Sequence, residues 1–336
     1  MKFFREQDNE FRQKEFYKDK DISDGYIFEE ESGFPLIKYH SLDKFDWLIS
    51  CQTTRKGGVS EGYFSELNLG ISNTDSFENI EKNYSLLADR LGVFPENIVI
   101  THQVHSTNVV YADEGMSIGG RIADLKEKGK IKQEQLVDVK NDFAEKYGSS
   151  DDVKTNNRLF LREISDNSDG IDGFYTDKAG LLLSTTFADC VPIYIVDPVE
   201  RHIALVHSGW KGTVNHIANV AIEKLEVLGS KAENMIGVVG ASICQTCYEV
   251  TDDVASEFKK EFADANISDI LQQTDEIHYQ LDLWAANWYN LKRAGLQSEN
   301  IHFCGICTMC NSDILFSHRA TNGKRGNINA FLGIRE

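Results

Sequence analysis

Residues 181–207 read LLLSTTFADCVPIYIVDPVERHIALVH, and this stretch decides the fold. It holds three short apolar runs, at 181–183, 193–196 and 203–206. Continuous apolar runs of four to eight residues are typical of strands that are buried inside a protein. The stretch therefore predicts three interior strands, with the polar turns between them at the strand ends.

Strand and helix patterns continue on both sides of this stretch. Toward the N-terminus the sequence predicts strands at 46–54, 98–100 and 109–111, and a helix at 79–91 that stops at Gly92. Toward the C-terminus it predicts helices at 213–228, 254–262 and 283–294, and a strand at 236–239. Strands and helices are mixed without strict alternation, which favours one α+β domain over a doubly wound sheet.

Two segments differ in character from this domain. Residues 1–33 are dense in charge and predict a polar N-terminal extension that carries at most a helix or an edge strand. Residues 114–168 are rich in polar side chains and predict an insertion with one amphipathic helix at 133–147. We expect a single catalytic domain at 34–336 that contains this insertion.

Composition excludes several classes of protein. The formal charge of −18 opposes binding to nucleic acid, and the cluster of Arg319, Lys324 and Arg325 is large enough for one phosphate only. No apolar run reaches the length of a membrane helix, and the N-terminus lacks the apolar core of a signal peptide. We expect a cytoplasmic protein, a monomer, whose seven cysteines are reduced.

Three segments place metal-binding side chains directly after predicted strands. They are QVHS at 103–106, ADCVP at 188–192 and VHSGWKG at 206–212. His105, Cys190 and His207 are suitable ligands for Zn²⁺, and three ligands leave a fourth position open for water or substrate, as catalysis requires. The ordinary alternative is a histidine bonded to a backbone carbonyl and a cysteine packed as a small apolar residue.

Apart from Cys51 and Cys190, which stand alone, the cysteines form two groups about 60 residues apart, a separation much wider than in a zinc ribbon. Three interpretations stay open: a second zinc site with four thiolates, an iron–sulfur cluster, or reduced thiols that include a redox-active pair. The two groups are Cys244 with Cys247, and Cys304, Cys307 and Cys310.

Many ordered segments resemble the YfiH/YlmD family, a laccase-like family labelled as multicopper polyphenol oxidases and later linked to purine nucleosides. The similarity covers most of the chain from about residue 34, apart from the insertion. The matching segments are TRKGGVS at 54–60, LNLG at 67–70, Asn83, QVH at 103–105, IDG at 171–173, ADCVP at 188–192, HSGWKG at 207–212, YEV at 248–250, Asp282-Leu283, Cys307-Thr308 and FSHR at 316–319.

The resemblance implies a single zinc ion held by His105, Cys190 and His207, with copper as the less favoured metal. It implies an α+β sandwich of mixed sheets between helical layers, related to the catalytic domain of cytotoxic necrotizing factors. It also implies phosphorolysis of adenosine, inosine, guanosine and methylthioadenosine, and deamination of adenosine. A role in editing peptidoglycan precursors has been attached to bacterial members.

Further residues are candidates for substrate chemistry. Arg55, beside a Gly-Gly turn, is our first candidate to bind an anionic oxygen, although a surface residue at a hairpin turn is equally expected. Asn68 and Arg319 are predicted to bind substrate. Asp189 is predicted to orient a ligand or act as a base, with a turn cap as the alternative. Many relatives carry Gly-Arg where this chain has Gly326-Asn327, so Lys324 or Arg325 would have to replace that arginine.

The leading hypothesis is a zinc-dependent purine nucleoside phosphorylase with adenosine deaminase activity, for which bound zinc would lower the pKa of water toward ~7. In a competing hypothesis Cys190 is the nucleophile and His207 the base of a hydrolase or amidase that acts on peptidoglycan precursors. A third, copper oxidation of phenols, requires several copper sites, and nine scattered histidines argue against it. A fourth is a zinc-bound scaffold that uses 114–168 as an interaction surface.

Overall fold

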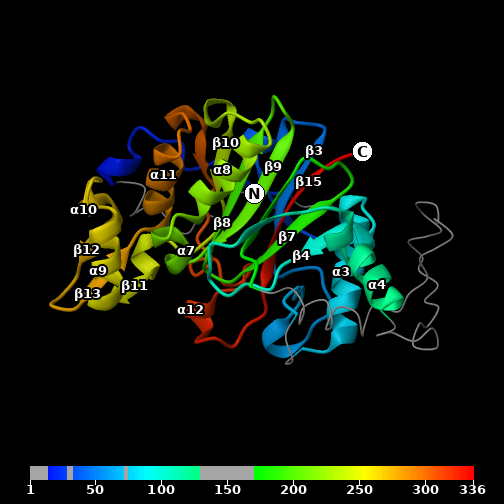
Figure 1. Ribbon diagram of the computed structural model, residues 1–336. Helices are drawn as coiled ribbons and strands as arrows, with labels where there is room; N and C mark the ends of the chain where they lie inside the picture. Colours follow the sequence, from blue (N-terminus) through cyan, green and yellow to red (C-terminus); the bar gives the residue numbers. More distant parts are fainter. Residues whose placement is uncertain (1–13, 29–32, 72–74, 129–169) are drawn as a thin grey trace.

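The computed structural model describes residues 14–28, 33–71, 75–128 and 170–336. In these residues two six-stranded sheets are stacked face to face, and helices cover both outer faces (Figure 1). In the view of Figure 1, α8 and α11 lie to the left of the sheets and α3 and α4 to the right. The result is a four-layer α/β/β/α sandwich, which confirms the α+β class and the layered arrangement.

The first sheet has the strand order β1-β2-β3-β15-β7-β4. All of its neighbouring strands are antiparallel except β7 and β4, which are parallel. The bounds are β1 Gly25–Phe28, β2 Leu36–Tyr39, β3 Leu48–Thr53, β4 Ile98–Ile100, β7 Leu182–Phe187 and β15 Ile328–Ile334.

The second sheet has the order β14-β10-β8-β9-β6-β5, with parallel pairs at both edges. Its centre is the hairpin of β8 and β9, in which every residue of both strands is buried. The bounds are β5 Val109–Tyr111, β6 Gly173–Thr176, β8 Val191–Asp197, β9 His202–Ser208, β10 Ile236–Val239 and β14 Ile301–Phe303. The interior strands predicted from 181–207 are thereby confirmed, divided between the two sheets.

Helices and a small third sheet complete the described part of the chain. The third sheet has the order β11-β13-β12, with bounds β11 Glu249–Thr251, β12 Leu271–Gln273 and β13 His278–Leu281. The α-helices are α2 His40–Asp43, α3 Phe77–Leu91, α4 Ile118–Glu127, α7 Trp210–Val214, α8 Ile217–Val227, α9 Asp252–Glu261, α10 Ile267–Ile270, α11 Leu283–Arg293 and α12 His318–Thr321. The 3-10 helices are η1 Glu15–Tyr17, η2 Gly62–Phe64, η3 Pro95–Asn97, η4 Glu114–Met116, η6 Ala232–Asn234, η7 Gln245–Cys247 and η8 Ser298–Asn300.

Three apolar clusters fill the spaces between the layers. The cluster between the two sheets includes Ile37 and Leu332 of the first sheet and Leu205 of the second. A larger cluster lies between the second sheet and α8, α9 and α11. The third lies between the first sheet and α3, where Ile80, Tyr84, Leu87 and Leu91 are buried. Strands in the middle of such a stack are buried on both faces, which explains their continuous apolar runs.

Local signals locate α3 correctly, whereas the helix predicted at 213–228 is interrupted. The hydroxyl of Ser76 accepts a hydrogen bond from the backbone N–H of Asn79, and α3 ends at Gly92, whose φ of 66° is left-handed. The predicted helix is divided into α7 and α8 because His216 adopts a left-handed φ of 59°. Apolar spacing does not reveal such a backbone change, since both halves keep their buried side.

The N-terminal segment is packed onto the domain. Residues 14–28, which the sequence assigned to a polar extension, include the edge strand β1 and the buried side chains of Phe16 and Tyr17. The Tyr17 hydroxyl donates to Asp282 Oδ1 at 2.9 Å, at the start of α11. The insertion begins with η4 and α4, and the helix predicted at 133–147 lies outside the described residues.

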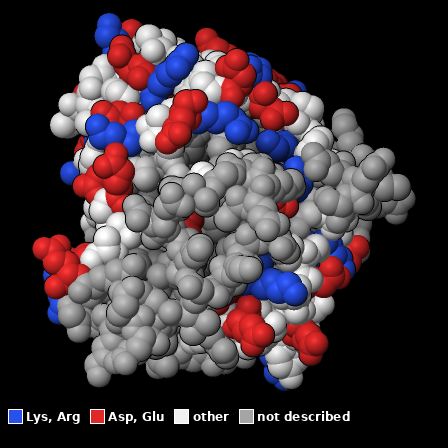
Figure 2. All heavy atoms as spheres, turned by 90° about the vertical axis from the view of Figure 1, so that its right-hand side faces the viewer, with Lys and Arg blue, Asp and Glu red and all other residues white. Residues whose placement is uncertain are grey.

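The described residues were compared with what a membrane and a nucleic acid would require, namely long apolar helices and a basic surface. In the described ranges no helix combines the length and the apolar character that crossing a bilayer requires. On the face shown in Figure 2, basic and acidic side chains of the described residues are interspersed and form no large basic patch. The expectation that the protein does not bind nucleic acid stays a prediction.

Candidate metal centre

The three predicted ligands come together where the chain crosses from one sheet to the other. His105 lies on the loop from β4 to β5, Cys190 on the turn from β7 to β8, and His207 on β9. One nitrogen of each imidazole and the Cys190 sulfur lie within 4.8 Å of one another. His207 is buried, Cys190 is intermediate and His105 is exposed. The centre is therefore buried on one side and open to solvent on the other.

Strained backbone occurs at two positions in this centre. His105 has a φ of 61° and Asp189, directly before Cys190, has a φ of 93°. Side-chain-bearing residues rarely adopt such values, which cost of order 1–3 kcal/mol and persist mainly at functional sites. The strain supports a functional role for the turns that carry His105 and Cys190.

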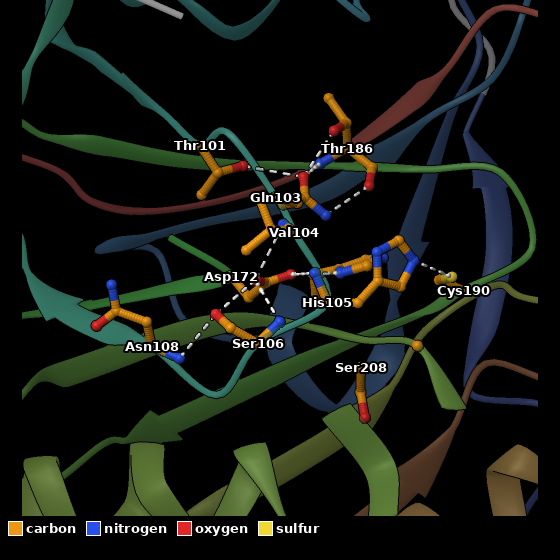
Figure 3. A network of polar contacts seen from close by, with 12 residues as sticks. Thr101, Gln103, Val104, His105, Ser106, Asn108, Asp172, Thr186, Cys190 and Ser208 are labelled. Atoms are coloured by element: carbon orange, nitrogen blue, oxygen red, sulfur yellow. Dashed lines mark hydrogen bonds and ion pairs between the residues drawn. The ribbon is translucent and has the colours of Figure 1, made fainter. Parts of the chain in front are cut away.

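Asp172, directly before β6, connects two of the ligands (Figure 3). Its carboxylate accepts hydrogen bonds from the backbone N–H groups of Val104, His105 and Ser106, at 3.2, 3.0 and 2.7 Å. The same carboxylate lies 3.0 Å from Nδ1 of His207. Burial raises the pKa of Asp172, but the hydrogen bonds from His207 and Ser106 outweigh burial and lower it. The ionised carboxylate thus holds the His105 loop against β9.

The contact with Asp172 also fixes the orientation of the His207 ring. Because Nδ1 faces the carboxylate, Nε2 is left to face Cys190 and His105. A carboxylate behind a metal-binding histidine is a common arrangement, since it selects the tautomer and increases the basicity of the free nitrogen.

Gln103 fixes the other side of the same loop. Its Oε1 accepts hydrogen bonds from the backbone N–H and the hydroxyl of Thr186, at 2.7 and 2.6 Å, and its Nε2 donates to the Thr186 carbonyl at 3.0 Å. Thr186 belongs to β7 of the first sheet, whereas Asp172 adjoins the second. The His105 loop is consequently held to both sheets.

Gly209 provides the space that the ligands occupy. A Cβ atom at this position would lie 2.8 Å from Cδ2 of His105 and 3.2 Å from the Cys190 sulfur. The backbone of Gly209 is an ordinary N-cap conformation with a φ of −69°, so the requirement for glycine comes from the close approach alone. This cradle fits a site in which an imidazole and a thiolate converge.

The electrostatics of the centre favour a thiolate at Cys190 and an imidazolium at His207. Burial raises the pKa of Cys190, but the positive charge of His207 and the hydrogen bonds from both histidines lower it to about 6. Burial lowers the pKa of His207, but the charge of Cys190 and the hydrogen bond with Asp172 raise it to about 9. At neutral pH Cys190 is therefore ready to bind a cation or to act as a nucleophile.

This charge state predicts the reactivity of Cys190 in the metal-free protein. Iodoacetamide reacts with the thiolate, so the alkylation rate should rise through about pH 6 and level off above pH 7, below the usual thiol range. Cys51 is a matched control, because burial raises its pKa to about 11 and the side chain is inaccessible. Peptide mapping by mass spectrometry gives both rates.

Added zinc should protect Cys190 from iodoacetamide, because the metal occupies the thiolate. A Cys190 rate that still climbs steeply between pH 8 and 9, or that zinc leaves unchanged, would contradict the arrangement of His105, Cys190 and His207.

Comparison with known proteins identifies the family. Residues 49–335 match the family model described as multi-copper polyphenol oxidoreductase laccase. The chain belongs to this family. A protein named purine nucleoside phosphorylase YlmD, from Bacillus subtilis, is 30% identical over 290 residues, covering 86% of this chain and 89% of its own. Another, named adenosine deaminase RL5 and from an unknown prokaryotic organism, is 30% identical over 302 residues, covering 87% and 98%.

Solved structures of the laccase-like family have the same fold. The crystal structure of YlmD from Geobacillus stearothermophilus has a TM-score of 0.73 and 27% identity, covering 94% of this chain and 100% of that one. That of the hypothetical protein YfiH from Bacillus licheniformis has a TM-score of 0.74 and 25% identity, covering 92% and 99%. The resemblance to the YfiH/YlmD family is thereby confirmed.

The family's description names several coppers, and the described residues can be compared with that requirement. Oxidation of phenols by several coppers requires several histidine-rich sites. Among the described residues, two clusters have metal-binding character, and only the one with His105, Cys190 and His207 contains histidine. His102, three residues before His105, is not part of that cluster.

Two predicted substrate-binding residues of this laccase-like chain already have protein partners. The Arg55 guanidinium donates to the carbonyls of Ser65 and Ser312, at 2.8 and 2.9 Å, and stacks on Phe316. Asn68 is buried, and its Oδ1 accepts hydrogen bonds from the backbone N–H groups of Gly70 and Asn327. The structure thus gives both a role in holding loops, and contact with substrate stays a prediction.

Asp189 and Arg319 lie beside the centre and contact each other. The carboxylate of Asp189 accepts hydrogen bonds from the Thr308 hydroxyl at 2.6 Å and from the backbone N–H of Arg319 at 2.7 Å. The Arg319 guanidinium stacks on Tyr248 and donates to the Glu249 carbonyl at 3.0 Å. Each carboxylate oxygen of Asp189 thus has one protein donor, and the role of Asp189 in orienting a ligand or acting as a base stays a prediction.

Asp172 lies in the IDG segment at 171–173, and the sequence does not indicate its role. Nothing local indicates that its carboxylate reaches a loop 66 to 68 residues earlier. The only available signal was an aspartate between an apolar residue and a glycine at the start of a strand, which ordinarily indicates a turn.

Proposed function

We propose that this chain is a zinc-dependent purine nucleoside phosphorylase that binds zinc through His105, Cys190 and His207 and also deaminates adenosine. The observation that carries the proposal is the convergence of two imidazole nitrogens and one sulfur within 4.8 Å beside the gap left by Gly209. Three protein ligands of borderline softness, with one side open, suit a catalytic zinc site. The names of relatives such as YlmD support purine nucleosides and phosphate as substrates.

Bound zinc would supply a Lewis acid and would lower the pKa of a water molecule at the open position. The chain supplies the rest of the chemistry. Asp172 keeps Nε2 of His207 directed at the centre and holds the loop of His105 in place. Asp189 fixes the turn of Cys190 through Thr308 and Arg319. These contacts preorganise the ligands, so that little rearrangement is needed when substrate binds.

Phosphorolysis also requires a group that binds phosphate near the centre, and Arg325 is our candidate. Burial lowers the pKa of Arg325, while the negative charges of Asp189 and Cys190 oppose this effect, which indicates that all three share one electrostatic environment. Its Nε is buried and has no hydrogen-bond partner among the described residues. A buried guanidinium N–H in need of an acceptor is suited to an anionic oxygen.

Arg325→Ala is accordingly expected to raise the KM for phosphate by about 10- to 100-fold, the equivalent of a charge-assisted hydrogen bond of about 1.5–3 kcal/mol. The KM for the nucleoside and the zinc content should change little. Lys324→Ala is the matched control, because Lys324 is the neighbouring cation and is exposed. Steady-state kinetics with each substrate varied in turn give both constants, and an unchanged phosphate KM would remove Arg325 from the site.

A second candidate function follows from a specific contact. Cys190, His207 and Asp172 are arranged like the nucleophile, base and orienting carboxylate of cysteine hydrolases, and the Cys190 sulfur lies 3.9 Å from Nε2 of His105. Such an enzyme would act on amide substrates, including peptidoglycan precursors, and would need no metal. The second histidine, His105, distinguishes this centre from a simple triad and favours the zinc proposal.

The experiment that tests the function is chromatography of adenosine and phosphate after incubation with zinc-loaded protein. Adenine with ribose 1-phosphate reports phosphorolysis, and inosine reports deamination. Both products should disappear in Cys190→Ala and after chelation, return when zinc is restored to the wild type, and persist in Cys51→Ala, which alters a buried cysteine in the first sheet.

Two results would overturn the proposal. Turnover that survives chelation but not thiol alkylation would favour the hydrolase. No turnover of adenosine, inosine, guanosine or methylthioadenosine would exclude the nucleoside reaction, and peptidoglycan precursors would then be the substrates to assay.

A further inference from the structure

Four cysteine side chains form a second cluster in the part of the chain that the structure describes. The sulfur atoms of Cys244, Cys247, Cys307 and Cys310 all lie within 4.8 Å of one another. All four are free thiols. None of them belongs to the site of His105, and the function proposed above does not use them.

Sheet topology brings the two pairs together. Cys244 and Cys247 follow β10, and Cys307 and Cys310 follow β14. These strands are parallel neighbours in the second sheet, so their carboxyl ends leave the same edge. A parallel bridge between Ser242 and Cys307 continues the pairing beyond the strands. A separation of 63 residues in sequence thus becomes direct contact in space.

Burial makes this cluster unlike a chance group of surface thiols. Cys244, Cys307 and Cys310 are no more than 5% exposed and belong to the core beneath the second sheet, while Cys247 packs against its edge. Because the four sulfurs contact one another, each of them has few contacts with apolar side chains of the core. Such a grouping is expected where the sulfurs share a ligand.

Backbone groups are directed at the sulfurs as well. The N–H groups of Cys244 and Cys310 both point to the sulfur of Cys307, with N···S distances of 3.3 and 3.5 Å. Backbone amides that donate to a cysteine sulfur are typical of metal-bound cysteines, where they help to hold the ligand in position.

The spacing fits a single tetrahedral ion. With Zn–S bonds near 2.3 Å, the sulfurs of a zinc tetrathiolate lie about 3.8 Å apart. The sulfurs of Cys247 and Cys310 lie 3.5 Å apart, and the other pairs are within 4.8 Å. An iron–sulfur cube has its cysteines on four separate irons, which places their sulfurs farther apart than ligands that share one ion. Two Cys-x-x-Cys pairs are also the usual ligand pattern of structural zinc.

We propose that Cys244, Cys247, Cys307 and Cys310 bind a second, structural zinc ion as a closed tetrathiolate. With four protein ligands it has no open position, so its role is to hold the loops after β10 and β14 together. The proposal is independent of the reaction at the first centre.

The loops that this zinc would join also support the first centre. Thr308, between the two cysteines of its loop, donates to the Asp189 carboxylate, and Tyr248, directly after Cys247, lies under the Arg319 guanidinium. Asp189 in turn precedes Cys190. Loss of the structural ion should therefore loosen the Cys190 turn and lower thermal stability.

Cys304 is excluded from the site although it begins the CxxCxxC sequence. Its side chain belongs to the core between the two sheets, on the opposite side of the second sheet from Cys307. The sequence alone left open which four of the five cysteines would form a four-thiolate site. The difference supplies a matched control, because Cys304→Ala removes a neighbouring buried cysteine without touching the proposed ligands.

The test is the zinc content of purified protein, measured by elemental analysis and native mass spectrometry. We expect two zinc ions per wild-type chain, one for each cluster, and the same number in Cys304→Ala. The double variant Cys247→Ser/Cys310→Ser should lose one zinc and melt at a lower temperature, while Cys190→Ala should lose the other. A wild-type chain with one zinc, unchanged in the double variant, would overturn the proposal.

A second measurement on the wild type keeps the proposal testable if the double variant does not fold. Replacement of zinc by Co²⁺ should produce the intense sulfur-to-cobalt charge-transfer bands of a tetrathiolate, and these should persist in Cys190→Ala. If the purified protein contains iron and absorbs visible light, the cluster is an iron site and does not bind zinc. Loss of titratable thiols without bound metal would indicate a disulfide, and either result would overturn the proposal.

Discussion

Asp172→Ala is expected to lower the zinc affinity of the His105, Cys190 and His207 centre by at least about 100-fold, the upper end of what loss of a carboxylate behind a metal ligand costs. The effect should be this large because one carboxylate performs two tasks. It fixes the His207 tautomer, and it accepts the backbone N–H groups of the loop that carries His105. Without it, the strained backbone of His105, with a φ of 61°, loses its support.

Competition with a chromophoric zinc chelator measures this affinity, and thermal unfolding shows whether each variant is folded. Asp172→Asn should have an intermediate effect. The amide oxygen of the asparagine can still accept a hydrogen bond, whereas its amide nitrogen cannot accept one. Asp177→Ala, an exposed aspartate just after β6, should bind zinc like the wild type. Wild-type affinity in folded Asp172→Ala would mean that the carboxylate does not organise the centre.

Gly209→Ala is expected to weaken zinc binding by about 10- to 100-fold, since forcing an extra carbon into a packed site costs about 1–3 kcal/mol. The added methyl group would overlap Cδ2 of His105 and press on the Cys190 sulfur. Relief requires one of these ligands to move away from the other, which breaks the ligand geometry. Nucleoside turnover should fall with zinc occupancy and recover in part at high zinc concentration.

Zinc titrations of activity and calorimetry on the same samples measure this effect. Lys211→Ala is the control, because Lys211 lies two residues farther along, in α7, and is exposed. Equal zinc affinity in Gly209→Ala and the wild type would show that the three side chains do not converge on one ion.

Much of the fold follows from local patterns. The apolar runs of 181–207 become β7, β8 and β9, because strands in a stacked pair of sheets are buried on both faces and need no polar side. The helix of 79–91 is bounded by a capping serine and a left-handed glycine, both visible in the sequence. The structure packs apolar side chains of η1 and of the edge strand β1 into the core, where a few of them suffice despite the charged surroundings.

The sequence alone predicted only part of the candidate site. Resemblance to the family selected His105, Cys190 and His207, while their spacing alone left ordinary roles open. The structure brings these side chains together because both the loop from β4 to β5 and the turn from β7 to β8 cross between the sheets at one place. Substrate contact by Arg55 and Asn68 stays a prediction, since both now have backbone partners.

The sequence by itself determined the α+β class, the interior strands and the residue types that can bind metal, because these depend on neighbouring residues and on side-chain chemistry. The tertiary structure decided which distant groups meet. It directed Asp172 to two ligands at once, joined Cys244 to Cys307 across parallel strands, and turned Cys304 to the opposite face of the sheet. The physical reason is that strand order and sheet stacking set these contacts, and a one-dimensional pattern contains neither.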